Sequence, residues 1–118
     1  MNRFFFAACL FTTGWAFTSC GLFGSEKGFE RMAAAHTGIR FNNQITESDT
    51  FNVLRFEYIY NGGGVGVGDV NNDGLTDVFF AGNQVSSELY LNRGDFKFED
   101  VTGAAGVRTN RWCTGVAM

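Results

Sequence analysis

A loop of nine residues, Asp69–Asp77, constrains this chain more than any other stretch, because oxygen-bearing side chains recur along it at regular spacing. Asp or Asn stands at its first, third, fifth and ninth positions, and Gly74 stands at the sixth, where glycine tolerates the positive φ of a sharp turn. Ca²⁺ takes about six to eight oxygen ligands, which alternating carboxylates on a tight loop can supply. The spacing predicts a Ca²⁺ site formed by the backbone carbonyl of Leu75 and the side chains of Asp69, Asn71, Asp73 and Asp77.

Two other interpretations of this loop have to be weighed. An EF-hand requires a bidentate Glu at its twelfth position, which is Phe80 here. The flanking stretches, Gly64–Gly68 and Val78–Ala81, are also typical of strands rather than helices. A metal-free polar turn between strands has the same Asn, Asp and Gly composition. Carboxylates crowded together without a cation repel one another, which favours the metal site.

The composition bounds the size of the chain and excludes one class of function. Its 118 residues are enough for at most one ordinary domain. The net charge is −3, and the lysines are Lys27 and Lys97 alone. Nucleic-acid binding needs a basic face, so no nucleic-acid partner is expected.

Residues 1–19 have the pattern of a secretory signal, with Arg3 as the positive start and an apolar stretch that is too short to span a membrane. The Ser19-Cys20 pair that follows resembles a bacterial lipobox, although Phe17 stands where Leu is usual. We therefore expect a lipoprotein signal peptide over 1–19, a membrane-anchoring lipid on Cys20 and a tether over 20–28. Ordinary signal-peptide cleavage is the alternative. Either route exports the chain, to the bacterial cell envelope as an outer-membrane lipoprotein or to the extracellular space.

The cysteines agree with export but offer no disulfide. Cys9 would leave with the leader and Cys20 would carry the lipid, which leaves Cys113 without a partner in the chain. Cys113 is therefore predicted to be a small buried apolar residue. The one histidine, His36, has no second ligand type near it in the sequence and is not expected to bind metal.

The stretch before the loop predicts a short helix followed by two strands. The helix is expected over 30–36 with Gly38 ending it, and the strands over 39–42 and 51–60. The second strand would place three aromatic side chains on one face: Phe56, Tyr58 and Tyr60. Such a face packs in a core more often than it serves as an aromatic ligand platform.

The glycines of Asn61–Gly64 do not form a nucleotide-binding loop, because neither G-x-G-x-x-G nor a P-loop Lys is present. They are expected to allow close backbone approach within a sheet. After the calcium loop, strands are predicted over 77–81, 88–91 and 96–101, joined by tight turns. Together with the strand before the loop, they predict a four-stranded antiparallel unit.

A second copy of this unit begins near the end of the sequence. Gly115–Met118 echoes Gly64–Val67 at an offset of 115 − 64 = 51 residues, a period typical of solenoids and propellers. One four-stranded sheet per period fits a propeller blade. The fold class predicted is all-β, with an antiparallel β-propeller blade followed by the first strand of the next, so that the propeller is incomplete in this chain.

Several stretches together resemble a known family. The loop with Gly-Val before it, Leu89–Asn92, Phe98–Thr102 and Ala105–Val107 resemble an FG-GAP/VCBS repeat. The stretches Thr37–Asn42 and Tyr60–Val65 are similar to the N-terminus of bacterial surface lipoproteins related to cartilage acidic protein, of the ASPIC/UnbV type.

The resemblance implies an integrin-α-like propeller whose calcium loops bridge strands within each blade. Asp69, Asn71, Asp73 and Asp77 stand at the ligand positions of the family. The implied organisation is an N-terminal propeller segment over 29–62, one repeat over 63–109, and a truncated second repeat over 110–118.

Two functions are compatible with these features. The first is a calcium-binding module of a cell-surface lipoprotein, with a structural role or a binding role toward an unknown surface protein or glycan. The alternative is part of an extracytoplasmic carbohydrate-active or sugar-oxidising enzyme with a propeller fold. No nucleophile–base pair stands out in the sequence, so we do not expect this chain to be an enzyme, and Ca²⁺ is the only cofactor predicted.

Overall fold

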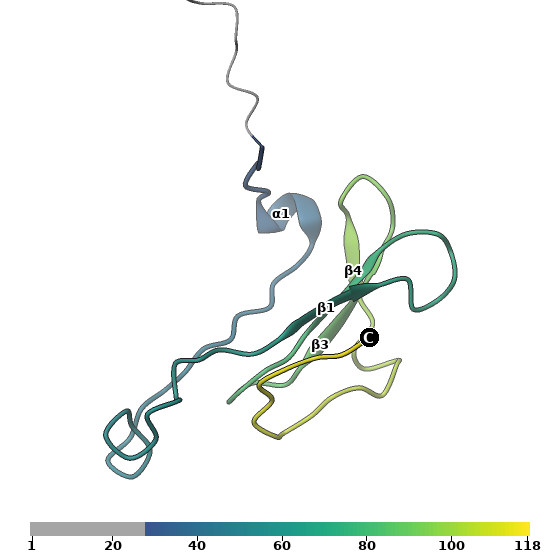
Figure 1. Cartoon of the computed structure of the whole chain (residues 1–118). Helices are drawn as coiled ribbons and strands as arrows, with labels where there is room; N and C mark the ends of the chain where they lie inside the picture. Colours follow the sequence, from purple (N-terminus) through teal and green to yellow (C-terminus); the bar gives the residue numbers. More distant parts are fainter. Residues whose placement is uncertain (1–27) are drawn as a thin grey trace, which may run out of the picture. The chain divides into compact units, whose positions relative to one another are not determined.

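The computed structural model describes residues 28–118. The predicted signal peptide, Cys9, the lipidation site Cys20 and all but the last residue of the tether lie outside this range. The described chain forms one antiparallel sheet of four strands in the order β1-β2-β3-β4 (Figure 1). The strands are β1 (Val65–Gly68), β2 (Asp77–Phe80), β3 (Glu88–Asn92) and β4 (Phe98–Asp100). This confirms the predicted all-β class and the architecture of a single propeller blade.

The strand register gives the sheet two different faces. Val65 pairs with Phe80 and Val67 with Val78, which in turn pairs with Tyr90. Directly paired residues project to the same side of an antiparallel sheet. We call this side the valine face, and it carries Val65, Val67, Val78, Phe80 and Tyr90. The opposite side, the glycine face, carries Gly66 and Gly68 of β1 together with Phe79 and Leu89.

The segment 38–43 packs on the β2–β3 part of the valine face. The Phe41 ring stacks on Phe80 with centroids 5.0 Å apart, and the Arg40 N–H donates to the Tyr90 hydroxyl at 3.2 Å. Tyr90 is consequently almost fully buried. The predicted strand over 39–42 is wrong, because the segment is held by side-chain packing and its backbone joins no ladder.

The predicted helix is present but shorter than expected. α1 spans Ala34–Thr37, so it begins four residues after the start of the predicted 30–36 range. Gly38 ends it as predicted, in the left-handed conformation with φ 77°, and donates its N–H to Ala34 at 2.8 Å. No helix in residues 28–118 is long and apolar enough to cross a membrane.

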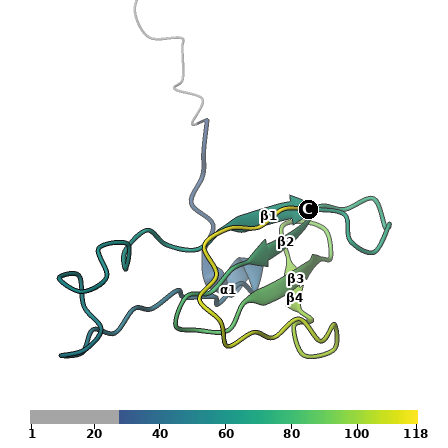
Figure 2. The ribbon, with the colours of Figure 1, turned by 60° about the horizontal axis from the view of Figure 1, so that its bottom comes forward.

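Residues 43–61 form an excursion that leaves the sheet and returns to it (Figures 1 and 2). Its second half consists of consecutive turns, so the predicted strand over 51–60 is wrong. Local side chains take the backbone N–H groups that a strand would offer to a neighbour. Ser48 accepts from Phe51 at 3.0 Å, Glu47 from Val53 at 3.1 Å, and Asn52 from Leu54 at 3.1 Å.

The aromatic residues of the excursion do not form the predicted core face. Tyr58 is 57% exposed and Tyr60 63% exposed, whereas Ile59 between them is fully buried. Phe51 and Phe56 instead meet Trp112 edge to face, each with a centroid separation of 5.4 Å. The turns therefore replace the alternation of a strand with a local aromatic cluster.

The C-terminal segment Gly115–Met118 lies over the glycine face of β1 (Figure 2). A Cβ atom placed on Gly64 would lie 2.7 Å from the Val116 nitrogen, and one on Gly66 would lie 2.4 Å from the Met118 sulfur. Real Cβ atoms do not approach other atoms so closely. The expectation that these glycines permit close approach is therefore confirmed.

A buried asparagine joins three distant segments. Asn83 is almost fully buried, and its side chain donates to the carbonyls of Cys113 at 2.9 Å and Gly62 at 3.3 Å. It also exchanges two hydrogen bonds with Asn43, which donates to its side chain and accepts its N–H. The start of the excursion and the stretch that contains Cys113 are thus both tied to the turn after β2.

Candidate metal centre

The predicted calcium loop joins β1 to β2, as the sequence suggested. Gly74 has φ 83° and Asn72 has φ 60°, both in the left-handed region. Asparagine is one of the few residues other than glycine that adopts this region readily. Asn72 and Gly74 together turn the chain sharply enough to bring the side chains of the loop back onto its own backbone.

Asp69 closes the loop at its N-terminal end. One of its carboxylate oxygens accepts the N–H of Asp73 at 3.1 Å, and the other accepts the N–H of Gly74 at 2.8 Å. The carboxylate is therefore folded back onto the backbone of the turn, although Asp69 stays exposed to solvent. The spacing of Asp and Asn along the loop predicts that the Asp69 carboxylate binds a cation at this turn.

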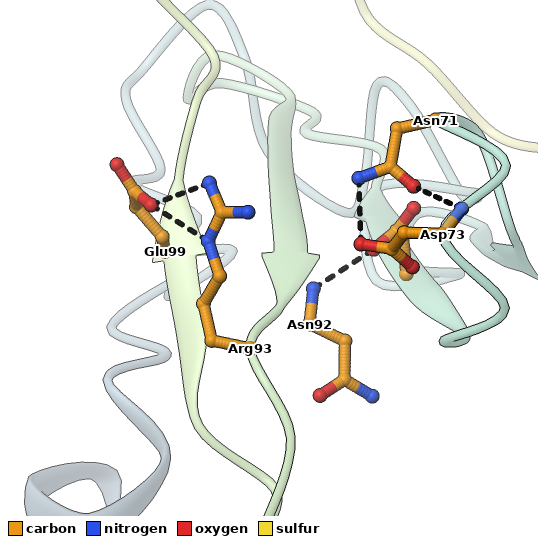
Figure 3. Close-up of polar contacts among 6 residues, drawn as sticks. Asn71, Asp73, Asn92, Arg93 and Glu99 are labelled. Atoms are coloured by element: carbon orange, nitrogen blue, oxygen red, sulfur yellow. Dashed lines mark hydrogen bonds and ion pairs between the residues drawn. The ribbon is translucent and has the colours of Figure 1, made fainter.

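Asn71 and Asp73 contact each other directly (Figure 3). The Asn71 amide donates to Asp73 at 2.9 Å, and the Asn71 oxygen accepts the Asp73 N–H at 3.0 Å. The other oxygen of Asp73 accepts the Leu75 N–H at 2.8 Å. The hydrogen bond from Leu75, followed by that from Asn71, lowers the pKa of the Asp73 carboxyl below its ordinary value. Asp73 is therefore an anion at neutral pH.

Asp77 is the first residue of β2, and its relative exposure is 0%. One carboxylate oxygen accepts the Val70 N–H at 3.0 Å, and the other accepts the Asn92 N–H at 2.8 Å. Within residues 28–118 Asp77 forms no salt bridge; the pair that does form, Arg93 with Glu99 at 2.7 Å, lies on the β3–β4 hairpin (Figure 3). Asp77 is thus a buried carboxylate held by two N–H groups and no cationic side chain.

The predicted ligands lie on one turn, but their carboxylates do not converge on a common point. In the described part of the chain, no three side chains among His, Cys, Asp and Glu assemble as a cluster that could hold a metal ion. Asp69 and Asp73 are linked through backbone N–H groups, and Leu75 contributes its N–H to the same turn. Asp77 is linked to the loop through Val70.

The donor set nevertheless fits a hard cation. All the side-chain donors are carboxylate or amide oxygens, the ligand type that Ca²⁺ prefers. Each carboxylate oxygen of Asp69, Asp73 and Asp77 accepts a single N–H. An ionised carboxylate has about four acceptor sites, so each of these oxygens keeps free lone-pair capacity.

Asn92, at the end of β3, is a site residue that the sequence analysis missed. Its N–H donates to Asp77, and its side-chain amide donates to the Thr76 carbonyl at 3.0 Å. Its oxygen accepts the Gly94 N–H at 2.9 Å, which starts the β3–β4 turn. The only signal in the sequence is an Asn just before a Gly-containing turn, and this signal does not reveal a contact with a loop 15 residues away.

The remaining predicted residues lie away from the loop. Cys113 is half-buried, so the prediction of a small buried apolar residue is only partly right, and its thiol contacts the Arg111 carbonyl at 3.4 Å. The His36 ring contacts the backbone oxygen of Asp95 at 3.0 Å. Within the described range, neither residue belongs to a group of three or more metal-ligating side chains.

Comparison with known proteins finds a family match for part of the chain. No curated protein sequence and no solved structure matches it. One family model does match, and the match begins at Asp69, the first residue of the candidate calcium loop, and continues through Met118. Residues 69–118 therefore carry an FG-GAP-like repeat.

Proposed function

We propose that the Asp69–Asp77 loop binds Ca²⁺ and that the sheet is a calcium-braced module of an exported surface protein. The side chains of Asp69, Asn71, Asp73 and Asp77 and the carbonyl of Leu75 would hold the ion. A bound Ca²⁺ supplies positive charge that links β1, β2 and the loop between them. Repeats of the FG-GAP type commonly bind Ca²⁺, which supports this assignment.

The buried carboxylate of Asp77 is the observation that carries the proposal. Burying an ionised carboxylate without a cationic partner is costly, because two neutral hydrogen bonds recover only part of the lost hydration. Asp77 has no salt bridge in residues 28–118, yet it is fully buried at the base of an acidic loop. A divalent cation beside it would compensate that charge together with those of Asp69 and Asp73.

The test is the change in melting temperature on adding Ca²⁺. At a Ca²⁺ concentration about 30 times the dissociation constant, binding to the folded state adds about 2 kcal/mol, a rise of several degrees for a domain of this size. This excess is about 3–30 mM Ca²⁺ if the affinity is that of other extracellular modules, on the order of 10⁻⁴–10⁻³ M. We expect Asp73→Ala to abolish this rise, because it removes a ligand while leaving the buried Asp77 in place.

Asp95→Asn is the matched control, since Asp95 is exposed on the β3–β4 turn and its φ of 52° is one that Asn tolerates. This variant should keep the full Ca²⁺-dependent rise. Isothermal titration with Ca²⁺ separates loss of binding from loss of folding. An Asp73→Ala protein that still gains the full thermal shift and binds Ca²⁺ with unchanged affinity would refute the assigned ligands.

We further propose that the role of the module is structural or one of binding a surface protein or glycan, not catalytic. The predicted lipid on Cys20 would hold it at the bacterial cell envelope, where extracellular Ca²⁺ is available. The relation to ASPIC/UnbV-type surface lipoproteins belongs to the same proposal, and it rests on the residues before the repeat. A glycan array probed with the full chain in Ca²⁺ and in chelator tests the binding role; signal unaffected by chelation would argue against a calcium-dependent glycan site.

A further inference from the structure

Asn61 and Gly62 lie where the excursion returns to β1, and they form the one Asn-Gly pair in the sequence. An asparagine followed by glycine is especially prone to deamidation, because a glycine nitrogen has no neighbouring Cβ to hinder its attack on the asparagine amide carbon. In a folded chain the reaction needs an accessible asparagine side chain. It also needs a glycine N–H that is not held by a hydrogen bond.

Both conditions are met at this pair. Asn61 is exposed, and its side chain forms no hydrogen bond within residues 28–118; its backbone N–H donates to the Tyr58 carbonyl at 3.1 Å. The Gly62 N–H donates to no acceptor in the described part of the chain, although the Gly62 carbonyl accepts the Asn83 amide at 3.3 Å. Apart from chain neighbours, no described atom lies within 4 Å of the position that a Gly62 Cβ would occupy, so the space beside this residue is open.

The Asp73-Gly74 pair has the opposite arrangement. Aspartate followed by glycine rearranges through the same kind of ring, so this pair is the natural comparison. The Gly74 N–H donates to the Asp69 carboxylate at 2.8 Å, and the Asp73 carboxylate itself accepts two N–H groups of the loop. The attacking nitrogen and the attacked carboxylate are both held, so the fold protects this pair and leaves the Asn-Gly pair open.

We propose that Asn61 is a site of spontaneous modification, which converts it to isoaspartate and aspartate in the folded chain. The Gly62 nitrogen attacks the side-chain amide carbon of Asn61, and the amide leaves as ammonia with the proton of that nitrogen, which closes a five-membered succinimide. Water then opens the ring, at the side-chain carbonyl to give aspartate or at the backbone carbonyl to give isoaspartate. The net change exchanges ammonia for water and adds one negative charge, with no other reactant.

Isoaspartate lengthens the backbone by one methylene group at a point that is held on both sides. Ile59 is fully buried just before it, and a Cβ atom on Gly63 just after it would lie 1.9 Å from the Ala81 carbonyl oxygen. The extra carbon therefore has to displace one of these two contacts. A chain that carries isoaspartate at position 61 should consequently melt at a lower temperature than the fresh chain.

The experiment follows residue 61 in the full chain during incubation in mildly alkaline buffer, by peptide mapping with mass spectrometry. Both products should accumulate at a rate similar to that of a synthetic peptide spanning 57–66. The rate should rise up to about tenfold per pH unit, because the attacking nitrogen must first lose its proton. Isoaspartate at position 73 should instead form far more slowly in the folded chain than in a peptide spanning 69–78.

Asn61→Gln is the matched variant, because its side chain would have to close a less favourable six-membered ring. Gln is compatible with this position, since Asn61 is exposed and its φ is not positive. The variant should keep its charge and melting temperature during an incubation that lowers the melting temperature of wild type. A folded wild-type chain that converts Asn61 much more slowly than the peptide would overturn the proposal, and so would earlier conversion of another asparagine. A chain that carries isoaspartate yet melts like the fresh protein would refute the predicted strain.

Discussion

Individual buried polar side chains hold this small sheet in place. The buried apolar residues are few and include Ile59, Leu89 and Tyr90, whereas Asp77, Asn83, Ser87 and Thr102 are buried as well. Each of these polar residues bonds to backbone groups of another segment or to the ends of its own turn. Buried polar groups are stable only when bonded in this way. At the scale of the residue, the shape of the blade therefore depends on side chain–backbone hydrogen bonds.

Thr102 continues the β3–β4 pairing through its side chain where the backbone ladder ends. Its hydroxyl accepts the buried Leu89 N–H at 3.0 Å and donates to Asp100 at 2.5 Å, while its N–H donates to the same carboxylate at 2.9 Å. The hydroxyl, then the N–H, lowers the pKa of Asp100 from its ordinary value. The ionised form of Asp100 is thus favoured in the folded state.

These hydrogen bonds predict that Asp100→Asn lowers the free energy of unfolding by an amount that depends on pH. Because the pKa is lowered in the folded state, the stabilisation from Asp100 is present above its ordinary pKa and is lost as the pH falls through the lowered one. The variant should lose up to about 1 kcal/mol at pH 7, a figure reduced for the solvent exposure of Asp100. In urea unfolding, the difference should disappear once the pH has fallen below the lowered pKa.

Thr102→Val provides the contrasting variant in the same experiment. It leaves the Leu89 N–H without an acceptor at every pH, so it should cost about 1–3 kcal/mol both at pH 7 and in acid. If Asp100→Asn lowers the free energy of unfolding by the same amount at every pH, the role assigned to the charge of Asp100 is contradicted.

At the scale of the element, glycines decide how closely the strands and their connections approach. Gly63 lies just before β1, and a Cβ atom on it would lie 1.9 Å from the Ala81 carbonyl oxygen. The neighbouring Gly64 carbonyl accepts the Ala81 N–H at 2.8 Å, which extends the β1–β2 ladder beyond Val65. The contact partner of Gly63 is backbone, so it cannot move aside without disturbing this ladder.

Gly63→Ala should therefore destabilise the chain by about 1–3 kcal/mol, the typical cost of overpacking. Gly115→Ala is the matched control, because no atom lies within 4 Å of its Cβ position and its φ is not in the left-handed region. Its effect should stay within about 0.5 kcal/mol, as for most surface substitutions. Equal free energies of unfolding for the two variants would show that the close approach at Gly63 does not constrain the fold.

The strands that were predicted correctly are those with strong local signals. β2 and β3 begin at the predicted residues, and β4 falls inside its predicted range, because turn-forming residues separate these stretches from one another. β4 is shorter than predicted because Asp95 and Phe96 both adopt a positive φ, which extends the turn into the expected strand. The turn-forming residues thus determine where the hairpins lie, but they do not determine the residue at which β4 begins to pair with β3.

At the scale of the whole molecule, the sheet is one blade with two unequal faces. Gly115–Met118 covers β1 on the glycine face, and the segment 38–43 covers β2 and β3 on the valine face. A single sheet of this size buries few apolar side chains, which limits the stability that it can reach alone.

The proposed anchor is also a property of the whole molecule. Cys20→Ser should release the protein from the membrane fraction of the producing bacterium, because the thiol that would carry the lipid is gone. Fractionation followed by immunoblotting measures this, and Cys113→Ser is the control that should stay with the membranes, since Cys113 lies in the described sheet unit. Membrane retention of the Cys20→Ser protein would argue for another anchor, and absence of the wild-type protein from the membrane fraction would argue for ordinary cleavage.

The sequence by itself determined the turns and the hairpins of the repeat, because both depend on residues close together in the chain. The spacing of Asp69–Asp77 and the left-handed glycine at position 74 are local properties, and so are the alternating strands on either side. The tertiary structure decided what those elements contact. It left 39–42 and 51–60 without strand partners, buried Asp77 against Asn92, and set Val116 and Met118 on the glycines of β1. These outcomes depend on which distant backbone groups compete for the same hydrogen bonds and space, and no local pattern records that competition.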